Sequence, residues 1–347
     1  MRRLAAVLSL ALLAAVAPAP AQAARDSSFT EEWAENDAGR MRYRVYVPAF
    51  VRGGGAGKGV PLVVALHGGN DSIEDTATVS GWNTLADQHG FVVAYPQEDP
   101  DNGRLGIWNW SSVARQGRED RAASLVALVT RTVTGRYAVD RGRVMVTGIS
   151  AGAGMAVAMS VAFPELYRAV GAEVGCMFGG ARCTHPPSCG PAGCETANAA
   201  RMYLTAEDSG RAAYEVMGAR AHRMPIVMSY GTADPAAAGV GQEDFLAQWL
   251  VTHDLVDDGE RNDSVPAEPV RSTTGHRNGR DFTVQVYADA DGCDLIHRWI
   301  IDGMGHQYSG GRTEDGSAPD GPDLRAAMYA FLLRHTAPRG PQCAAAP

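Results

Sequence analysis

The sequence predicts an α/β protein with one mostly parallel central sheet, covered by helices on both faces, in a single domain. Short apolar, β-branched runs that end in Gly or Pro alternate with helical patterns along most of the chain. These runs are apolar throughout, as strands are when a sheet is buried on both faces. With 347 residues, the chain is long enough for one large domain of this kind.

The elements of this sheet can be placed in chain order. Residues 41–48 alternate between apolar and polar side chains and predict an antiparallel strand at the edge of the sheet. Buried strands are expected at 60–68, 90–96, 143–148, 169–175, 225–231, 282–288 and 295–303. Helices are expected at 118–137, 152–163, 206–222 and 322–335. The stretches 176–205 and 255–281 lack a regular pattern and are expected to be surface loops over the site.

The first 23 residues are set apart from this pattern. Arg2 and Arg3 precede a short apolar run, and the small residues Ala21 and Ala23 follow it. This order is typical of a secretory signal peptide, and the run is shorter than the roughly 20 residues that a membrane span needs. We therefore expect residues 1–23 to be removed and residues 24–347 to be secreted as a soluble domain.

Composition excludes several classes of partner. The formal net charge is −8 and no basic run is present, so the chain lacks the positive surface that nucleic acids require. We expect no nucleic-acid or membrane partner, no metal, no organic cofactor, and a monomer. The Gly-rich stretch 53–59 lacks the pattern of a phosphate-binding loop and precedes a strand, so it is interpreted as a turn.

Six cysteines favour disulfide bonds, because their number is even and the chain is expected to be exported. The first four lie close together, but they lack a C-x₂-C pair and have only His185 nearby, which disfavours a metal site. The spacing leaves the pairing open. A Cys293–Cys343 bridge is a natural guess. The cysteines are Cys176, Cys183, Cys189, Cys194, Cys293 and Cys343.

The stretch Gly148-Ile149-Ser150-Ala151-Gly152 fits G-x-S-x-G, the pattern of a nucleophile elbow. Matches arise by chance in a glycine-rich chain, so the context decides. Here Ser150 lies on the turn between an expected strand and an expected helix, as the elbow requires. We interpret Ser150 as a nucleophile rather than as a small residue in a tight turn.

A serine nucleophile needs a base and an acid, and in this kind of sheet both follow later strands. Asp234 comes directly after the strand at 225–231, and His306 comes after the strand at 295–303. We expect these three side chains to meet where the carboxyl ends of parallel strands share one edge. The competing aspartates are Asp208, Asp257, Asp258 and Asp302. The other histidines after Ser150 that we considered, His253, His276 and His335, are expected on the surface.

The oxyanion of an acyl-transfer reaction also needs hydrogen-bond donors. The Gly-rich turn "ALHGGN" follows an early strand, so we assign the backbone N–H groups of Gly69 and Ala151 to this role. His67 either fixes this turn through its ring or is purely structural, and both interpretations stay open. Trp108 and Trp110 are two residues apart and point the same way in an extended segment, so we name them as substrate-binding candidates, with core packing as the alternative.

Taken together, these motifs resemble the extracellular poly(3-hydroxybutyrate) depolymerases and their relatives, the feruloyl and acetylxylan esterases, within the α/β-hydrolase fold. The likeness runs from about residue 40 to 335 and rests on "LHGGN", "GFVVAYPQ", "WNW", "GISAG", "GTADP" and "GMGHQYSGG", in that order. The resemblance implies a secreted α/β-hydrolase catalytic domain over residues 24–347 that hydrolyses carboxylic esters, with Ser150, Asp234 and His306 as its triad.

Three departures from the family pattern are visible. Gly69 stands where the family often has Cys, Ala153 stands where it usually has Gly, and no linker to a substrate-binding module is seen. The last departure weakens the case for attack on crystalline polymer. We predict cleavage of a polyester or of short-chain acyl esters. The alternatives are a feruloyl or acetylxylan esterase acting on plant cell-wall polysaccharide, a serine peptidase of the same fold, and a binding protein that has lost catalysis.

Overall fold

The computed structural model describes nine segments of the chain, and every structural statement below concerns these segments. They are residues 26–54, 59–101, 106–110, 117–180, 189–190, 193–194, 204–236, 239–311 and 320–335. The expected signal peptide at 1–23, together with Cys183 and Cys343, lies outside them. Cys189 and Cys194 are described by their backbone alone.

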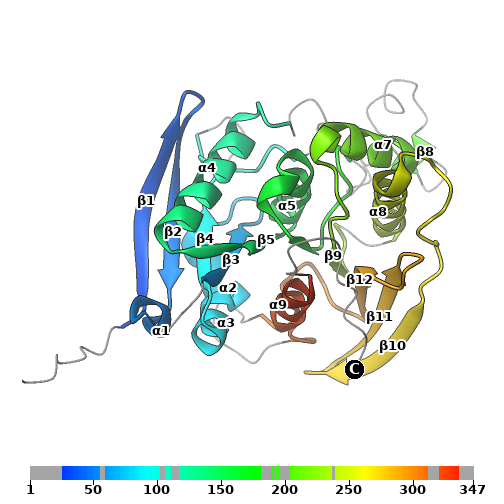
Figure 1. Cartoon of the computed structure of the whole chain (residues 1–347). Coiled ribbons are helices and arrows are strands. Elements are labelled where there is room, and N and C mark those ends of the chain that lie inside the picture. The colour runs from blue at the N-terminus through cyan, green and yellow to red at the C-terminus, as the bar shows by residue number, and fades with distance from the viewer. Residues whose placement is uncertain are drawn as a thin grey trace, which may run out of the picture.

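A ten-stranded sheet crosses the molecule in the order β1-β2-β4-β3-β5-β6-β9-β12-β11-β10 (Figure 1). The strands from β4 to β12 in this order are parallel, and an antiparallel pair of strands extends the sheet at each end. The mostly parallel sheet predicted from the sequence is therefore confirmed. The strands span Ser28–Asn36 (β1), Gly39–Val47 (β2), Val60–Leu66 (β3), Val92–Pro96 (β4), Val139–Ile149 (β5), Ala169–Glu173 (β6), Ile226–Gly231 (β9), Arg271–Arg277 (β10), Arg280–Ala288 (β11) and Asp294–Ile301 (β12).

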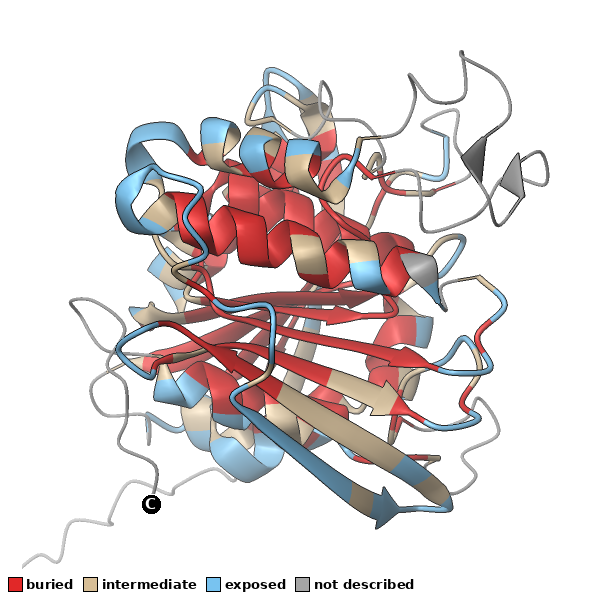
Figure 2. Cartoon of the chain, turned by 90° about the vertical axis from the view of Figure 1, so that its right-hand side faces the viewer, coloured by how far each residue is buried: buried red, intermediate tan, exposed pale blue. Residues whose placement is uncertain are grey.

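Helices cover both faces of this sheet (Figures 1 and 2). One apolar cluster joins the sheet to α4, α5, α7 and α8, and a second joins its other face to α2, α3 and α9. A short helix, α1, a separate two-stranded ribbon and two 3-10 helices, Pro164–Leu166 (η2) and Gly218–Arg220 (η3), complete the described elements. The helices and the ribbon span Ala49–Arg52 (α1), Ile73–Ser80 (α2), Trp82–His89 (α3), Arg121–Arg136 (α4), Ala151–Ala162 (α5), Ala206–Met217 (α7), Val240–Asp258 (α8), Leu324–Arg334 (α9), Cys189–Gly190 (β7) and Gly193–Cys194 (β8).

Both ends of the sheet differ from the prediction. The strand expected at the edge, now β2, is covered by β1, which pairs with it along its whole length. At the other end, β10 lies inside the stretch 255–281 that was expected to be a loop. Both outer strands are rich in polar residues and largely exposed, so they lack the apolar pattern by which buried strands are recognised.

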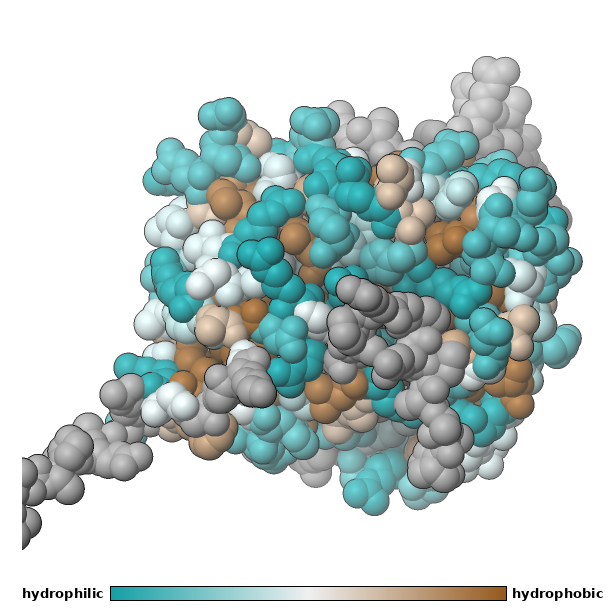
Figure 3. All heavy atoms as spheres, in the orientation of Figure 1, coloured by the Kyte–Doolittle hydropathy of each residue, from teal (hydrophilic) through white to brown (hydrophobic). Residues whose placement is uncertain are grey.

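The outer surface carries hydrophilic residues over much of the face drawn in Figure 3, with apolar residues in small separate groups. Within the described segments, no helix combines the length and the apolar composition that crossing a bilayer requires.

Candidate active site

Ser150 lies on a sharp turn between β5 and α5. Its φ of 55° and ψ of −121° place a non-glycine residue in the positive-φ region, which side chains rarely adopt. Two backbone hydrogen bonds hold the turn: Ser150 N–H donates to the Glu173 carbonyl at 3.0 Å, and Gly154 N–H donates to the Ser150 carbonyl at 3.0 Å. The local geometry is that of the nucleophile elbow that the sequence pattern predicts.

The two glycines of the pattern are required by close packing. A Cβ atom on Gly148 would lie 2.4 Å from the backbone carbon of Gly152, and one on Gly152 would lie 2.3 Å from the carbonyl oxygen of His67. Neither distance is compatible with a side chain. The elbow is therefore pressed against the turn after β3, which brings Ser150 close to the "ALHGGN" segment.

Asp234 and His306 are in direct contact. His306 Nδ1 lies 2.8 Å from Asp234 Oδ2, and the Asp234 side chain is fully buried, whereas about one third of the His306 side chain is exposed. Asp234 Oδ1 also accepts a hydrogen bond from Ala236 N–H at 2.7 Å. A buried carboxylate that is held on both oxygens fixes the orientation of the imidazole and leaves its other nitrogen free to face outward.

The loops that carry this pair are packed tightly together. Ala233 N–H donates to the Met304 carbonyl at 3.1 Å, and a Cβ atom on Gly231 would lie only 2.0 Å from the same carbonyl oxygen. The competing aspartates are engaged elsewhere. Asp302 accepts a hydrogen bond from Thr232, and Asp208 accepts one from the hydroxyl of Thr205, the N-cap residue of α7. Asp257 pairs with Arg223, and Asp258 accepts from the Glu260 N–H and the Asn262 side-chain amide.

The three candidate residues follow parallel strands that lie near one another in the sheet. Ser150 follows β5, Asp234 follows β9 and His306 follows β12, and only β6 separates β5 from β9. Within the described segments, no hydrogen bond joins Ser150 to His306. In hydrolases without substrate this contact is often long and tightens when the substrate binds.

Glu173, at the end of β6, links the Ser150 turn to the loop that carries His306. The sequence analysis missed this residue. Its carbonyl accepts from Ser150 N–H, and its carboxylate accepts from Ser309 N–H at 3.1 Å in the loop that carries His306. Burial raises the pKa of Glu173 to about 7, although Arg325 and the Ser309 N–H group oppose this shift. A single charged residue within the apolar run 169–175 was the available signal.

Gly69 and Ala151 lie side by side at the serine. A Cβ atom on Gly69 would be 3.8 Å from the Ala151 Cβ atom. Within the described segments, neither backbone N–H group donates a hydrogen bond to another protein group. Two unused donors beside the elbow are the arrangement that binding of an oxyanion requires.

His67 anchors the turn next to these donors. Its Nδ1 lies 2.7 Å from the Gly68 carbonyl, and its Nε2 lies 3.0 Å from Glu98 N–H. A carbonyl needs a protonated ring nitrogen and an N–H group needs an unprotonated one, so the ring is neutral with its proton on Nδ1. Burial lowers the pKa of His67 to about 4, in agreement with this assignment.

The prediction that Trp108 binds substrate is wrong. Its side chain has no exposed area, packs against the His67 ring at 4.7 Å between centroids with the two planes tilted, and donates from Nε1 to the His67 carbonyl at 2.9 Å. Its large apolar ring is more stable in the core than in a groove. Trp110 is partly buried and covers Gly154, where a Cβ atom would lie 2.9 Å from the indole ring.

The expectation that His253 lies on the surface is also wrong. It is buried in α8, and neither ring nitrogen has a hydrogen-bond partner. Burial lowers the pKa of His253 to about 3, so the ring is neutral. It packs beside Trp249, at 5.6 Å between ring centroids. His276, by contrast, is exposed as expected.

Among the described residues, no group of three or more His, Cys, Asp or Glu side chains has the geometry of a metal site. Cys176 and Cys293 are both buried, and neither is a free thiol.

The chain resembles known esterases in sequence. The family described as Esterase PHB depolymerase matches residues 41–264. A poly(3-hydroxyalkanoate) depolymerase C from Paucimonas lemoignei is 28% identical over 250 residues, which are 71% of this chain and 54% of that protein. An acetylxylan esterase from Coprinopsis cinerea is 27% identical over 259 residues, 73% of this chain and 63% of that protein. The chain thus spans about half to just under two thirds of the length of these relatives.

Solved structures show the same fold. The acetyl xylan esterase from Aspergillus awamori superimposes with a TM-score of 0.63 at 20% sequence identity, over 88% of this chain and 99% of that one. An S-formylglutathione hydrolase from Agrobacterium tumefaciens gives a TM-score of 0.50 at 16% identity, over 90% of this chain and 96% of that one. At these identities the likeness shows the α/β-hydrolase fold.

Proposed function

The chain belongs to the esterase PHB depolymerase family, and on this premise we propose that it hydrolyses carboxylic esters through an acyl-enzyme on Ser150. The observation that carries the proposal is the 2.8 Å contact between His306 Nδ1 and buried Asp234, at the same edge of the sheet as the Ser150 elbow. A serine on an elbow, with an imidazole oriented by a carboxylate, is the arrangement that activates a hydroxyl nucleophile.

The reaction proceeds in two halves. His306 Nε2 accepts the proton of Ser150 Oγ as this oxygen attacks the ester carbonyl, and Asp234 stabilises the imidazolium that forms. The imidazolium then donates its proton to the departing alcohol, which leaves an acyl-enzyme. Water, activated by the same nitrogen, attacks the acyl carbon and releases the acid.

The backbone N–H groups of Gly69 and Ala151 bind the negative oxygen that develops on the carbonyl carbon. The proximity of the two residues and the absence of other acceptors for their N–H groups within the described chain support this role. The contacts of His67 hold the Gly68–Gly69 turn in place, so His67 acts by positioning one of these donors.

Export and disulfide formation belong to the same proposal. Residues 1–23 are a secretory signal peptide, and residues 24–347 are the secreted catalytic domain. The six cysteines form disulfides in the oxidising environment outside the cytoplasm, with Cys293 paired to Cys343. The absence of a free thiol at buried Cys176 and Cys293 supports disulfide formation, and the Cys293–Cys343 pairing stays a proposal. Mass spectrometry of a non-reduced digest tests it.

The substrate is a polyester or an acylated polysaccharide, the two classes named in the relatives. Trp110 remains a candidate for contact with the acyl group, since it is partly buried above α5 close to the elbow. No cofactor is needed for this chemistry.

The decisive experiment is hydrolysis of p-nitrophenyl acetate by Ser150→Ala. We expect a loss of about a millionfold in kcat, since removal of the nucleophile abolishes the acyl-enzyme route. Ser160→Ala, in which the lost hydroxyl only donates to the Val157 carbonyl within α5, is the matched control and should keep its activity. Turnover by Ser150→Ala at the wild-type rate would refute the proposal.

A further inference from the structure

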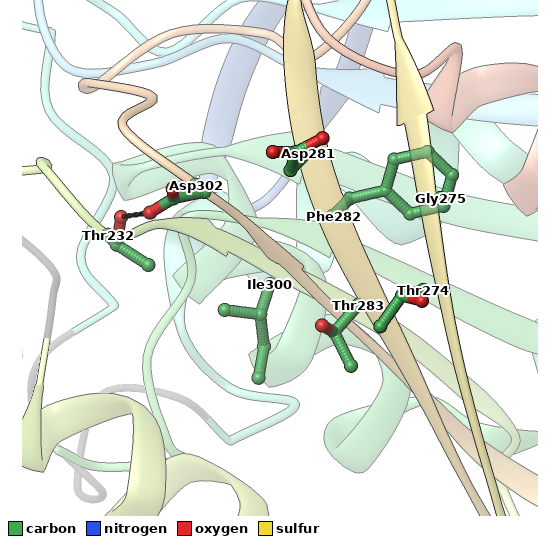
Figure 4. A pocket seen from close by; sticks show the side chains of 8 residues that line it. All are labelled: Thr232, Thr274, Gly275, Asp281, Phe282, Thr283, Ile300 and Asp302. Atoms are coloured by element: carbon green, nitrogen blue, oxygen red, sulfur yellow. Dashed lines mark hydrogen bonds between the residues drawn. The ribbon is translucent and has the colours of Figure 1, made fainter.

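A groove of about 540 Å³ lies on the outer part of the sheet, where β10 and β11 extend past the helices that cover the central strands (Figures 2 and 4). It is lined by three threonines and two aspartates, together with Gly275, Phe282 and Ile300. The polar residues are Thr232, Thr274, Thr283, Asp281 and Asp302.

The strand register places these side chains on one face. Thr274 of β10 pairs with Thr283 of β11, which in turn pairs with Ile300 of β12, so the three residues form one row across three strands. Asp302 N–H donates to the Asp281 carbonyl at 2.9 Å, which places the two aspartates in the next row. The groove is therefore a regular surface of the sheet rather than a gap between loops.

One end of the groove is lined by Thr232 and Asp302, which begin the two loops that carry Asp234 and His306. Thr232 precedes Asp234 by two residues, and Asp302 precedes His306 by four. Thr232 Oγ1 donates to Asp302 Oδ1 at 2.9 Å and accepts from Gly303 N–H at 2.8 Å. The same residues thus close the groove and support the two loops that carry the Asp234–His306 pair. A molecule lying in the groove has one end at the base of these two loops.

The chemistry of the walls distinguishes two kinds of substrate. Carboxylates only accept hydrogen bonds, and threonine hydroxyls both donate and accept. A sugar chain presents many hydroxyl donors and satisfies these groups. An aliphatic polyester presents only acceptor oxygens and hydrocarbon, so it would strip water from Asp281 and Asp302 without replacing their hydrogen bonds, which is costly.

The negative charge of the walls favours a neutral sugar over an acidic one. Asp281 pairs with His276 at 2.7 Å on the exposed side, and Asp302 accepts from Thr232. None of the residues that line the groove in the described chain is Arg or Lys. Arg280, whose charge also acts on Asp302, is paired with both carboxylate oxygens of Asp320. An acidic sugar would therefore be repelled by the two wall carboxylates, whereas a neutral sugar would not.

We propose that this groove binds the neutral sugar chain that carries the ester, so that the natural substrate is an acylated neutral polysaccharide rather than a polyester. The inference rests on the proposed esterase function. It adds the chemical class of the alcohol component of the ester, which is the sugar chain. Thr274 and Thr283 hold the sugar hydroxyls through their side chains, and Ile300 contacts the apolar face of a sugar ring.

The test compares two substrates on matched variants. The double variant Thr274→Val/Thr283→Val removes both hydroxyls with little change in shape. Thr273→Val removes a neighbouring exposed hydroxyl on the opposite face of β10 and is the control. KM and kcat are measured on acetylated xylo-oligosaccharides and on p-nitrophenyl acetate, which has no sugar. Trimers of 3-hydroxybutyrate serve as the polyester probe.

The double variant should raise KM for the acetylated xylo-oligosaccharides between about fivefold and a hundredfold, the range for two lost hydrogen bonds. It should leave kcat and the p-nitrophenyl acetate reaction unchanged, and Thr273→Val should change neither substrate. An unchanged KM for the oligosaccharides, or a rise for the polyester trimers instead, would overturn the inference. A wild-type protein inactive on p-nitrophenyl acetate would instead overturn the esterase function itself.

A direct binding measurement tests sugar binding in the groove independently of the esterase activity. Deacetylated xylohexaose is titrated into Ser150→Ala by calorimetry, where no turnover occurs. We expect binding that weakens in the Thr274→Val/Thr283→Val background and is retained with Thr273→Val. Absence of binding to the Ser150→Ala protein would overturn the groove assignment while leaving the esterase function intact.

Discussion

The serine side and the outer side of the candidate site are built differently. Around Ser150, glycines are required because the backbone of Gly152 lies against the His67 carbonyl, and the nearby polar groups are buried and paired. Along β10 and β11 the surface is open, and the threonines and aspartates are largely exposed. The elbow has no room for a Cβ atom on Gly148 or Gly152, whereas the outer side forms an open groove.

Because of this difference, substitutions on the two sides should have different effects on the reaction. The geometry of bond cleavage is fixed by packing, so changes on the serine side should affect folding or kcat for every ester. The recognition of the alcohol depends on exposed hydroxyls, so changes on the outer side should affect KM for large substrates alone. The two aspartates of the neighbouring loops, Asp234 and Asp302, provide the strongest test of this separation.

Asp234→Asn should lower kcat for p-nitrophenyl acetate by about 10⁴-fold. The amide no longer stabilises the imidazolium, and it can hold His306 in the wrong tautomer. The measurement is the steady-state rate at neutral pH, with circular dichroism to show that the variant is folded. Asp302→Asn, which alters a carboxylate bound to Thr232 rather than to His306, is the matched control.

Asp302→Asn should keep most of the activity on this small ester. A loss of similar size in both variants would contradict the separation, since it would show that both loops act on the imidazole.

Gly152→Ala tests the crowding on the serine side. The added Cβ atom would lie 2.3 Å from the backbone oxygens of both His67 and Leu66, so either α5 or the turn after β3 must move. We expect a loss of about 3 kcal/mol or more in the free energy of unfolding, at the upper end of the usual cost of overpacking. Urea denaturation followed by tryptophan fluorescence measures it. A change below about 0.5 kcal/mol would mean that the elbow is not tightly packed.

Glu173→Gln tests the residue that joins the Ser150 turn to the loop carrying His306. The burial that raises the pKa of Glu173 from its ordinary 4.5 to about 7 is opposed by Arg325 and Ser309 and assisted by Asp323; the ring of Tyr308 lies close by. Between these two values the folded chain holds a proton that the unfolded chain has released. The wild-type free energy of unfolding therefore falls as pH rises from 4.5 to 7, by at most about 3 kcal/mol.

The glutamine variant has no such proton, and its amide oxygen can still accept from Ser309 N–H. The variant should therefore gain stability relative to the wild type between pH 5 and pH 8. Urea denaturation of both proteins at the two pH values measures this gain. An equal difference at both values would show that Glu173 does not titrate in this range.

The same contrast explains what the sequence could predict. The elbow, the two strands that lead to Asp234 and His306, and the parallel core all have signatures that arise from packing: runs of apolar residues, and glycines where a Cβ atom cannot fit. The contact between His306 and Asp234 was expected because loops after parallel strands share one edge, and the structure brings these two side chains together.

The parts that escaped prediction have weaker or conflicting signals. The strand β10 reads "RSTTGHR" and is exposed along its length, so it has no apolar face to recognise. Trp108 was considered for a groove because it lies two residues from Trp110, yet pattern alone cannot show that its ring fits beside His67. In α8, the apolar pair Phe245 and Trp249 indicated a buried helical face that would have placed His253 inside.

Gly135→Ala gives the smallest expected effect and tests the crowding argument from the opposite direction. Gly135 lies in the last turn of α4, is exposed, and has open space where a Cβ atom would be. Alanine loses less backbone entropy in a helix than glycine, so the substitution should stabilise the protein by about 0.5 kcal/mol, reduced by fraying at the helix end. Urea denaturation alongside Gly152→Ala measures it. Destabilisation here of the size expected at Gly152 would show that the loss at Gly152 reflects glycine content rather than the absence of space at the elbow.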